Sequence, residues 1–177
     1  MLRPLLLAAA LPCAFTMLLS LKAGAQVSEC PTYHRFNCER SGDARFSVNG
    51  QSRSAMVKIG EETELNIIVY RGQDYRISVC HDTKILGEDL AIRLVEKIRT
   101  AKPGGNKGEM VETEKVLWDN TEHDMAPSIE FSCTATKRVA VEVNAPGAAE
   151  RKGKKADIDI GCVGILIEHM PSPGIGF

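Results

Sequence analysis

The chain has 177 residues, of which 44% are hydrophobic and 25% are charged, with 22 Lys and Arg against 23 Asp and Glu. Because the few basic loops are dispersed, this balance excludes the concentrated basic face that nucleic-acid binding requires. About 150 residues remain after removal of the leader described next, which is enough for one domain with a real core.

The first residues have the three parts of a secretory signal peptide. A short positive start at 1–3 precedes an apolar stretch at 5–21, and small residues at Ala23 and Ala25 indicate cleavage before Gln26. The alternative is a retained membrane anchor, because the run is about long enough to span a bilayer, but two prolines interrupt it. No other apolar run is long enough to span. The sequence therefore predicts an exported protein, periplasmic or extracellular, with a signal peptide at 1–25, an N-terminal segment with a local disulfide at 26–48, a β-sandwich at 49–171 and a C-terminal tail at 172–177.

Five cysteines remain after the leader, and disulfides are the default expectation in an oxidising compartment. Cys30 and Cys38 are close in sequence, which suits a local bridge. Cys80 and Cys162 each lie in an apolar strand, and a bridge between them would close a long loop worth about 4 kcal/mol. The odd number leaves one thiol over, and Cys133 is the candidate. A metal site is the rival interpretation, but CxxC and HxxxH spacings are absent from the sequence.

Eight segments alternate between apolar and polar residues with the period of two that is typical of strands. The clearest is Asp74–Cys80, with Tyr75, Ile77 and Val79 on one face. The segments are 54–59, 64–70, 74–80, 91–98, 114–118, 128–133, 138–143 and 161–168. They predict an all-β, antiparallel two-sheet β-sandwich of jelly-roll or Greek-key type. A helix over 86–99 is the competing prediction, and 32–39 is expected to form a short helix or an irregular cap.

Two long loops interrupt this pattern. Lys102–Gly108 is too rich in Gly and Pro to lie inside a strand, and a second loop runs from Ala145 to Ala156. The second loop contains the basic run Arg151–Lys155. That run could contact an anionic polymer, but it is more simply a solvated loop.

The order of these features resembles that of a group of uncharacterised exported bacterial proteins. The segments that carry the resemblance are NGQSRSA at 49–55, GQDYRISVC at 72–80, LWDN at 117–120 and GCVGILIEHMP at 161–171. The strand succession is similar, more distantly, to the pre-peptidase C-terminal type of β-sandwich, a domain appended to secreted enzymes. The resemblance implies a sandwich in which Cys80 and Cys162 meet, and it carries over no active site. The chain departs from the pattern in its two enlarged loops and in its additional thiol at Cys133.

The stretch 119–124 concentrates oxygen-bearing side chains between two strand segments. Asp119, Asn120, Glu122 and Asp124 could supply oxygens to calcium, although their spacing does not match an EF-hand. The simpler interpretation is a turn, because Asp and Asn readily hydrogen-bond their own backbone.

Two further sets of polar residues are candidates for a cation site. Asp157 and Asp159 alternate before the last strand and more simply form a solvated edge. His81 and His169 lie near strand ends, and with Glu168 they would form a zinc site if the two strand ends met.

Aromatic residues suggest a third kind of site. Trp118, Tyr70 and Tyr75 could form a platform for stacking a carbohydrate, although core packing is the simpler explanation. Catalysis has little support, since the sequence lacks a Gly-x-Ser-x-Gly elbow and Cys133 lies among apolar neighbours.

The leading hypothesis is therefore a small, exported, non-catalytic binding or accessory module that recognises an envelope protein or a carbohydrate, with no resident cofactor. The alternatives are a metal-dependent hydrolase, and a structural or assembly protein that pairs through an edge strand.

Overall fold

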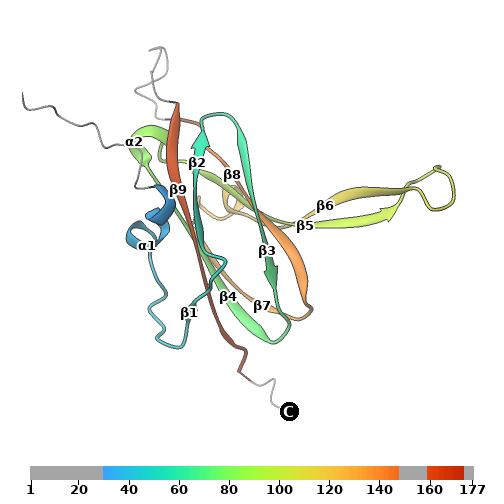
Figure 1. The fold of residues 1–177 in the computed structure, drawn as a ribbon, viewed down its shortest axis with the longest axis horizontal. Helices are drawn as coiled ribbons and strands as arrows, with labels where there is room; N and C mark the ends of the chain where they lie inside the picture. The colour runs from blue at the N-terminus through green and yellow to red at the C-terminus, as the bar shows by residue number, and fades with distance from the viewer. Residues whose placement is uncertain (1–29, 148–158, 174–177) are drawn as a thin grey trace, which may run out of the picture.

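The computed structural model describes residues 30–147 and 159–173, and these residues form two packed antiparallel sheets (Figure 1). The strands are β1 (Ser47–Val48), β2 (Arg53–Lys58), β3 (Glu62–Val69), β4 (Gln73–His81), β5 (Ala91–Ala101), β6 (Met110–Asp119), β7 (Ser128–Cys133), β8 (Lys137–Asn144) and β9 (Ile160–Pro171). The helices are η1 (Cys30–Thr32), α1 (Tyr33–Asn37), α2 (Thr83–Leu86) and η2 (Asn120–Glu122). The predicted signal peptide, the basic run 151–155 and Asp157 lie outside the described residues. Within those residues, no helix is long and apolar enough to span a membrane.

The predicted two-sheet sandwich is confirmed. The first sheet has the order β1-β9-β4-β7, and β2 pairs with β9 beyond the end of β1. The second sheet has the order β3-β8-β5-β6. All eight predicted strands are present, and the short β1 is an addition.

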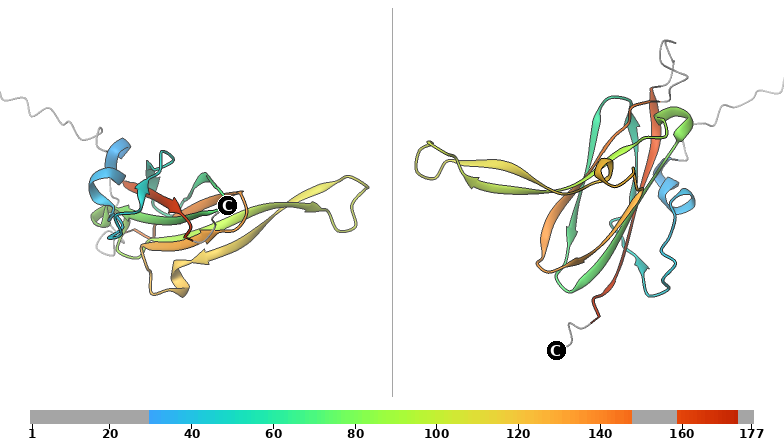
Figure 2. Two further views of the ribbon diagram at one scale, coloured as in Figure 1. Left: turned by 90° about the horizontal axis from the view of Figure 1, so that it is seen from below. Right: turned by 180° about the vertical axis from the view of Figure 1, so that it is seen from behind.

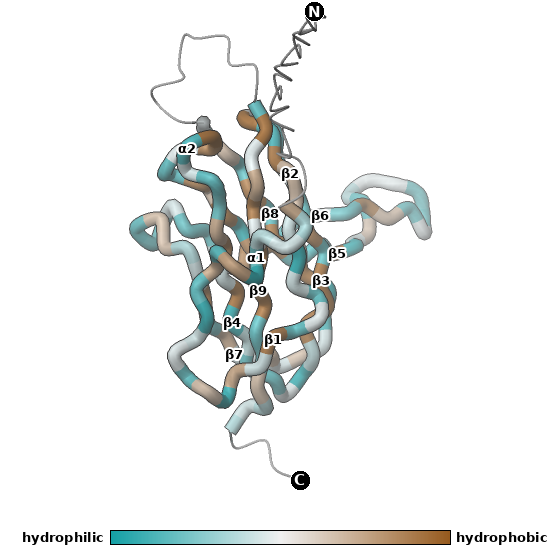
Figure 3. Tube along the Cα trace, turned by 60° about the vertical axis from the view of Figure 1, so that its left-hand side comes forward, coloured by the Kyte–Doolittle hydropathy of each residue, from teal (hydrophilic) through white to brown (hydrophobic). Residues whose placement is uncertain are grey.

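The core lies between the sheets and follows the predicted alternation (Figure 3). Tyr75, Ile77 and Val79 of β4 are at most 5% exposed, and the alternate valines of β8 are equally buried. On β4 the intervening Arg76 and Ser78 are also buried, because an N-terminal segment covers the outer face of this sheet. We call this segment, residues 30–41, the cap.

The competing helix prediction over 86–99 is wrong. Leu86 ends the short helix α2, and β5 begins at Ala91. Leu90, Ile92 and Leu94 are all buried, which is the two-residue period of a strand. This strand, β5, lies between β8 and β6. The short helix expected within 32–39 is present as α1.

The hairpin of β5 and β6 extends well beyond the sandwich (Figures 1 and 2). Its connecting loop is the predicted Gly- and Pro-rich segment 102–108. We call residues 97–114 the arm.

Candidate functional site

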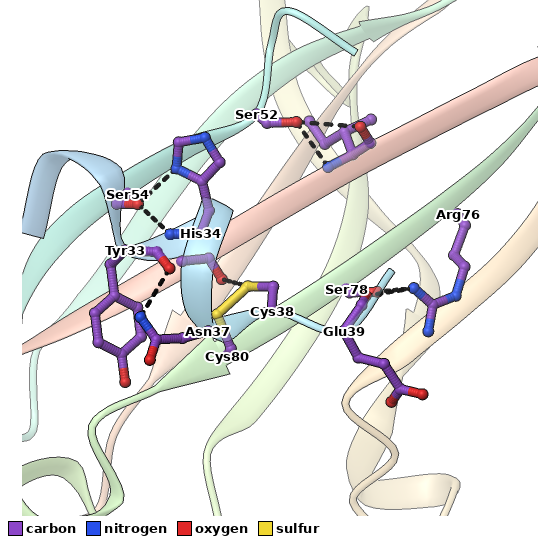
Figure 4. Close-up of a disulfide and its surroundings, with 12 residues drawn as sticks. Tyr33, His34, Asn37, Cys38, Glu39, Ser52, Ser54, Arg76, Ser78 and Cys80 are labelled. Carbon is purple, nitrogen blue, oxygen red and sulfur yellow. Dashed lines mark hydrogen bonds between the residues drawn. A yellow bond between two sulfur atoms is a disulfide. The ribbon is translucent and has the colours of Figure 1, made fainter. Parts of the chain in front are cut away.

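The two disulfides fasten the cap to two different strands. Cys30 pairs with Cys162 of β9, with a Cα–Cα distance of 5.3 Å. Cys38 pairs with Cys80 of β4, with a Cα–Cα distance of 4.9 Å (Figure 4). The predicted pairings Cys30–Cys38 and Cys80–Cys162 are therefore wrong. The reason is tertiary, because α1 lies across neighbouring strands and each end of the cap meets a different one.

Two glycines of β9 allow helices to pack directly on the sheet. A Cβ atom on Gly164 would lie 2.7 Å from the Cα atom of His34 and 2.8 Å from the Sγ atom of Cys80. A Cβ atom on Gly161 would lie 2.7 Å from the Cγ atom of Leu86 in α2. The GCVG motif is thus explained by close packing of helices on a strand.

His34 joins the cap to β2 through Ser54. The His34 backbone N–H donates to Ser54 Oγ at 2.8 Å, and His34 Nδ1 lies 2.7 Å from the same oxygen (Figure 4). Burial lowers the pKa of His34, and the nearby Arg35 lowers it further. The lowered pKa favours the neutral imidazole, in which an unprotonated Nδ1 accepts a hydrogen bond from the Ser54 hydroxyl.

A buried ion pair lies beneath the rest of the cap. Glu168 is 1% exposed and accepts a hydrogen bond from the Ser41 backbone N–H at 2.8 Å. Arg76 lies 3.4 Å from the Glu168 carboxylate and donates to the Glu39 carbonyl at 2.7 Å. Both charges thus have polar partners, as buried ions require. This pair was missed in the sequence, where Arg76 looked like an ordinary outward residue.

The stretch 119–124 forms a turn around the short helix η2, which was the simpler of the two interpretations of its sequence. Asp119 accepts hydrogen bonds from the backbone N–H and the hydroxyl of Thr121, and these bonds lower the pKa of Asp119. Asn120 is fully buried, and its amide bonds the backbone of Leu90 and Ile92. Asn120 is therefore occupied as a structural residue. Within 30–147 and 159–173, no three His, Cys, Asp or Glu side chains converge to hold a metal ion.

The two histidines proposed for zinc do not meet. Antiparallel pairing of β4 and β9 places His81 opposite Val163 and His169 opposite Tyr75. His81 Nε2 lies 2.8 Å from the Gly87 carbonyl oxygen, while Glu168 is buried beneath the cap. Asp159 is the described member of the Asp157/Asp159 pair, and its backbone carbonyl accepts a hydrogen bond from the Ile59 backbone N–H.

The three aromatic residues do not form a shared platform. Tyr75 is a core residue, 1% exposed, and its hydroxyl accepts the backbone N–H of Tyr70. Trp118 packs against the core and stacks on His123, with ring centroids 5.8 Å apart. Tyr70 alone is more than half exposed. The prediction of a stacking surface is therefore wrong for Tyr75, because Tyr75 lies on the same face of β4 as Ile77 and Val79, which is the core face.

Cys133 is a free, buried thiol, and its Sγ lies 3.1 Å from the Ala135 carbonyl oxygen. It was the cysteine expected to remain unpaired. Its 3% exposure fits an inert packing residue.

The arm begins where β5 loses one of its two neighbours. Pairing of β5 with β8 ends at Val95, opposite Ala140, whereas pairing with β6 continues to Ala101, opposite Met110. A register shift at Leu94/Val95 marks the same place. Beyond it the arm is a two-stranded ribbon, and no other described strand pairs with either of its edges.

The two faces of the arm differ in chemistry. One face carries opposed charges, with Lys97 near Glu114 at 3.9 Å and Arg99 near Glu112 at 3.8 Å. Lys97 also contacts Glu64 of β3. The other face continues the core side of β5 and carries uncharged, β-branched residues in two cross-strand pairs, Ile98 with Thr113 and Thr100 with Val111.

A charged row lies at the base of the arm on the outer face of the second sheet. Arg93 contacts Glu62 at 3.0 Å and Glu142 at 2.7 Å. Glu142 is only 2% exposed, and this burial raises its pKa although Arg93 opposes the shift. Arg93 thus holds two carboxylates from neighbouring strands where the arm leaves the sandwich.

Neither a family model nor a curated protein matches this chain. The resemblance to exported β-sandwich proteins and to the pre-peptidase C-terminal type of domain therefore stays a prediction. The site must be argued from its own geometry.

Proposed function

We propose that the protein is an exported, non-catalytic binding module and that the arm is its recognition element. The single observation that carries this proposal is the continuation of the β5–β6 pairing past Val95 without a second neighbouring strand or a core. A binding module of this kind combines a rigid scaffold with a projecting element that contacts the partner.

Export is supported by the two disulfides and by the leader predicted in the sequence. Structural disulfides persist in the periplasm and outside the cell and are rare in the cytosol. Both bridges join segments that are distant in sequence, with separations of 132 and 42 residues, so each closes a long loop of the unfolded chain.

The partner that best fits the arm is a protein segment in extended conformation. An isolated two-stranded hairpin is marginally stable in water, and its open edges present unpaired backbone N–H and C=O groups. A third strand added to either edge would satisfy these groups, which is the mode called β-augmentation. Of the three aromatic residues considered for stacking a carbohydrate, Tyr75 is in the core and Tyr70 alone is more than half exposed, so they do not favour a carbohydrate over a protein.

Site-specific photo-crosslinking in the cells that export the protein tests this proposal. A photoreactive amino acid would replace Thr100 or Thr113 on the arm, and Glu61 in the exposed turn between β2 and β3 would serve as the matched control position. We expect one discrete protein adduct from the arm positions and none from the turn. Equal adducts from all three positions, or none from the arm, would contradict the proposal.

A further inference from the structure

A groove runs between the cap and the edge of the first sheet. It has a volume of about 420 Å³. Its walls are four residues of the cap (Cys30, Pro31, His34 and Arg35) and residues 52–56 at the start of β2. This volume is within the range of ligand-binding clefts, roughly 300–1,000 Å³.

One wall of the groove is β2, and β2 has an open edge. β2 pairs with β9 on one side, and no described strand pairs with its other side. The neighbouring edge on β3 is different, because the side-chain amide of Gln51 bonds both the backbone N–H and the carbonyl of Ile68, at 2.8 and 2.9 Å. Gln51 thus occupies the edge of β3 at Ile68, whereas the edge of β2 stays available along the groove.

The groove carries positive charge that is not neutralised within the described residues. Arg35 and Arg53 both line it and are exposed, and neither is among the residues that form ion pairs. Five other arginines contact carboxylates, namely Arg40, Arg45, Arg76, Arg93 and Arg99. A guanidinium without a carboxylate partner can bind one from a ligand in a bidentate manner.

The cap wall is held in place before any ligand arrives. The Cys30–Cys162 disulfide fixes one end of the wall to β9, and the His34–Ser54 hydrogen bonds fix the middle to β2. A preformed groove loses little conformational entropy on binding, which favours affinity.

We propose that this groove binds an extended peptide segment rich in Asp and Glu. The segment pairs its backbone with the open edge of β2, so its adjacent side chains point to opposite faces of that strand. Carboxylates on the two faces then reach Arg35 on the cap side and Arg53 on the other side, where Arg53 lies opposite the core residue Ile165 of β9. Met56, 62% exposed and in the lining of the groove, provides an apolar contact for an intervening side chain. The groove and the arm are separate sites, so this inference does not depend on the function proposed for the arm.

Fluorescence anisotropy of the mature, oxidised protein tests the inference with a labelled octapeptide of sequence Glu-Glu-Val-Thr-Glu-Glu-Val-Thr, which presents carboxylates on both faces of an extended strand. We expect saturable binding that weakens with added salt and falls about tenfold or more in the variant with Arg35→Glu and Arg53→Glu. Arg71→Glu is the matched control, because Arg71 is also exposed and outside every described ion pair but lies in the turn between β3 and β4. This control should bind like the wild type.

Two further probes separate strand pairing from simple charge attraction. A peptide with the same side chains but methylated at alternate backbone nitrogens keeps the charge and loses donors for pairing, so it should bind about tenfold more weakly. Equal binding of the methylated peptide, an equal loss in the Arg71→Glu control, or no binding of the octapeptide would each overturn the inference.

Discussion

The cap and the arm both lie outside the sandwich core, but they differ in how firmly contacts attach them to it. The cap is short, and two disulfides, a buried ion pair and a His–Ser contact fix it to the outer face of the first sheet. The arm is longer, and it is held together by the backbone pairing of β5 with β6 and by exposed ion pairs. Exposed pairs of this kind contribute at most about 1 kcal/mol each. The cap is thus fixed to the sandwich by covalent and buried contacts that the arm does not share within the described residues.

Removing one cap disulfide should produce the largest loss of stability. The Cys38–Cys80 bridge closes a loop with a separation of 42 residues, for which chain entropy predicts about 4 kcal/mol. We expect the variant with Cys38→Ala and Cys80→Ala to lose stability of this order in denaturant unfolding. Cys133→Ala, which also removes a buried sulfur, should cost only about 1 kcal/mol. Equal losses in the two variants would show that the bridge does not fix the cap.

Adding a methyl group to β9 beneath the cap should cause the next largest loss of stability. Gly164→Ala would place Cβ within 2.8 Å of the His34 backbone, and overpacking of this kind costs about 1–3 kcal/mol. The control is Gly42→Ala, where a Cβ meets nothing within 4 Å. Thermal unfolding should separate the two variants clearly. If both had the same melting temperature, the cap would not contact β9 as closely as described.

Acid should weaken the contact between the cap and β2. The pKa of His34 is lowered by burial and by Arg35, so the unfolded chain takes up this proton at a higher pH than the folded protein does. Stability contributed by neutral His34 is therefore present above the ordinary histidine pKa and is lost as pH falls below about 6.5. Thermal unfolding at about pH 7.5 and about pH 5.5 should show a larger decrease for the wild type than for His34→Asn. An identical decrease would contradict a buried, neutral His34.

Shortening the arm should have the smallest effect on stability but should abolish binding of the partner to the arm. Replacing residues 98–113 with Asn-Gly, which favours a two-residue turn, keeps the pair of Lys97 with Glu114. We expect the free energy of unfolding to change by less than about 1 kcal/mol, because the removed residues are mostly exposed. Because the deletion removes both photoreactive positions, binding is measured directly, and the partner that the crosslink identifies should no longer bind the shortened protein. A loss of several kcal/mol would mean that the arm belongs to the folding core.

The sequence predicted what depends on local alternation. Tyr75, Ile77 and Val79 were placed on one face by their spacing, and the structure buries all three. The disulfide partners were predicted wrongly, because the pairing depends on α1 crossing β9 and β4, and no local sequence pattern indicates that crossing. The burial of Arg76 was missed for the same reason, since a strand pattern does not report what covers its second face.

The arm was visible in the sequence only through its loop at 102–108. Alternation in β5 gives the same pattern whether a strand has one neighbour or two, so the end of pairing with β8 at Val95 left no mark. A weaker signal was present, because Ile98 is the last large apolar residue of β5 before several charged and small ones. The edges available for binding are a property of sheet order, which the sequence did not specify.

Amide hydrogen exchange of the mature, oxidised protein tests the central contrast most directly. We predict slow exchange in β4 and β9 beneath the cap, and exchange faster by orders of magnitude in residues 98–113 of the arm. Addition of the purified partner that the crosslink identifies should slow amide exchange in the arm and leave the exchange rates of β4 and β9 unchanged. Arm amides that exchange as slowly as those of β4 in the free protein would contradict the account.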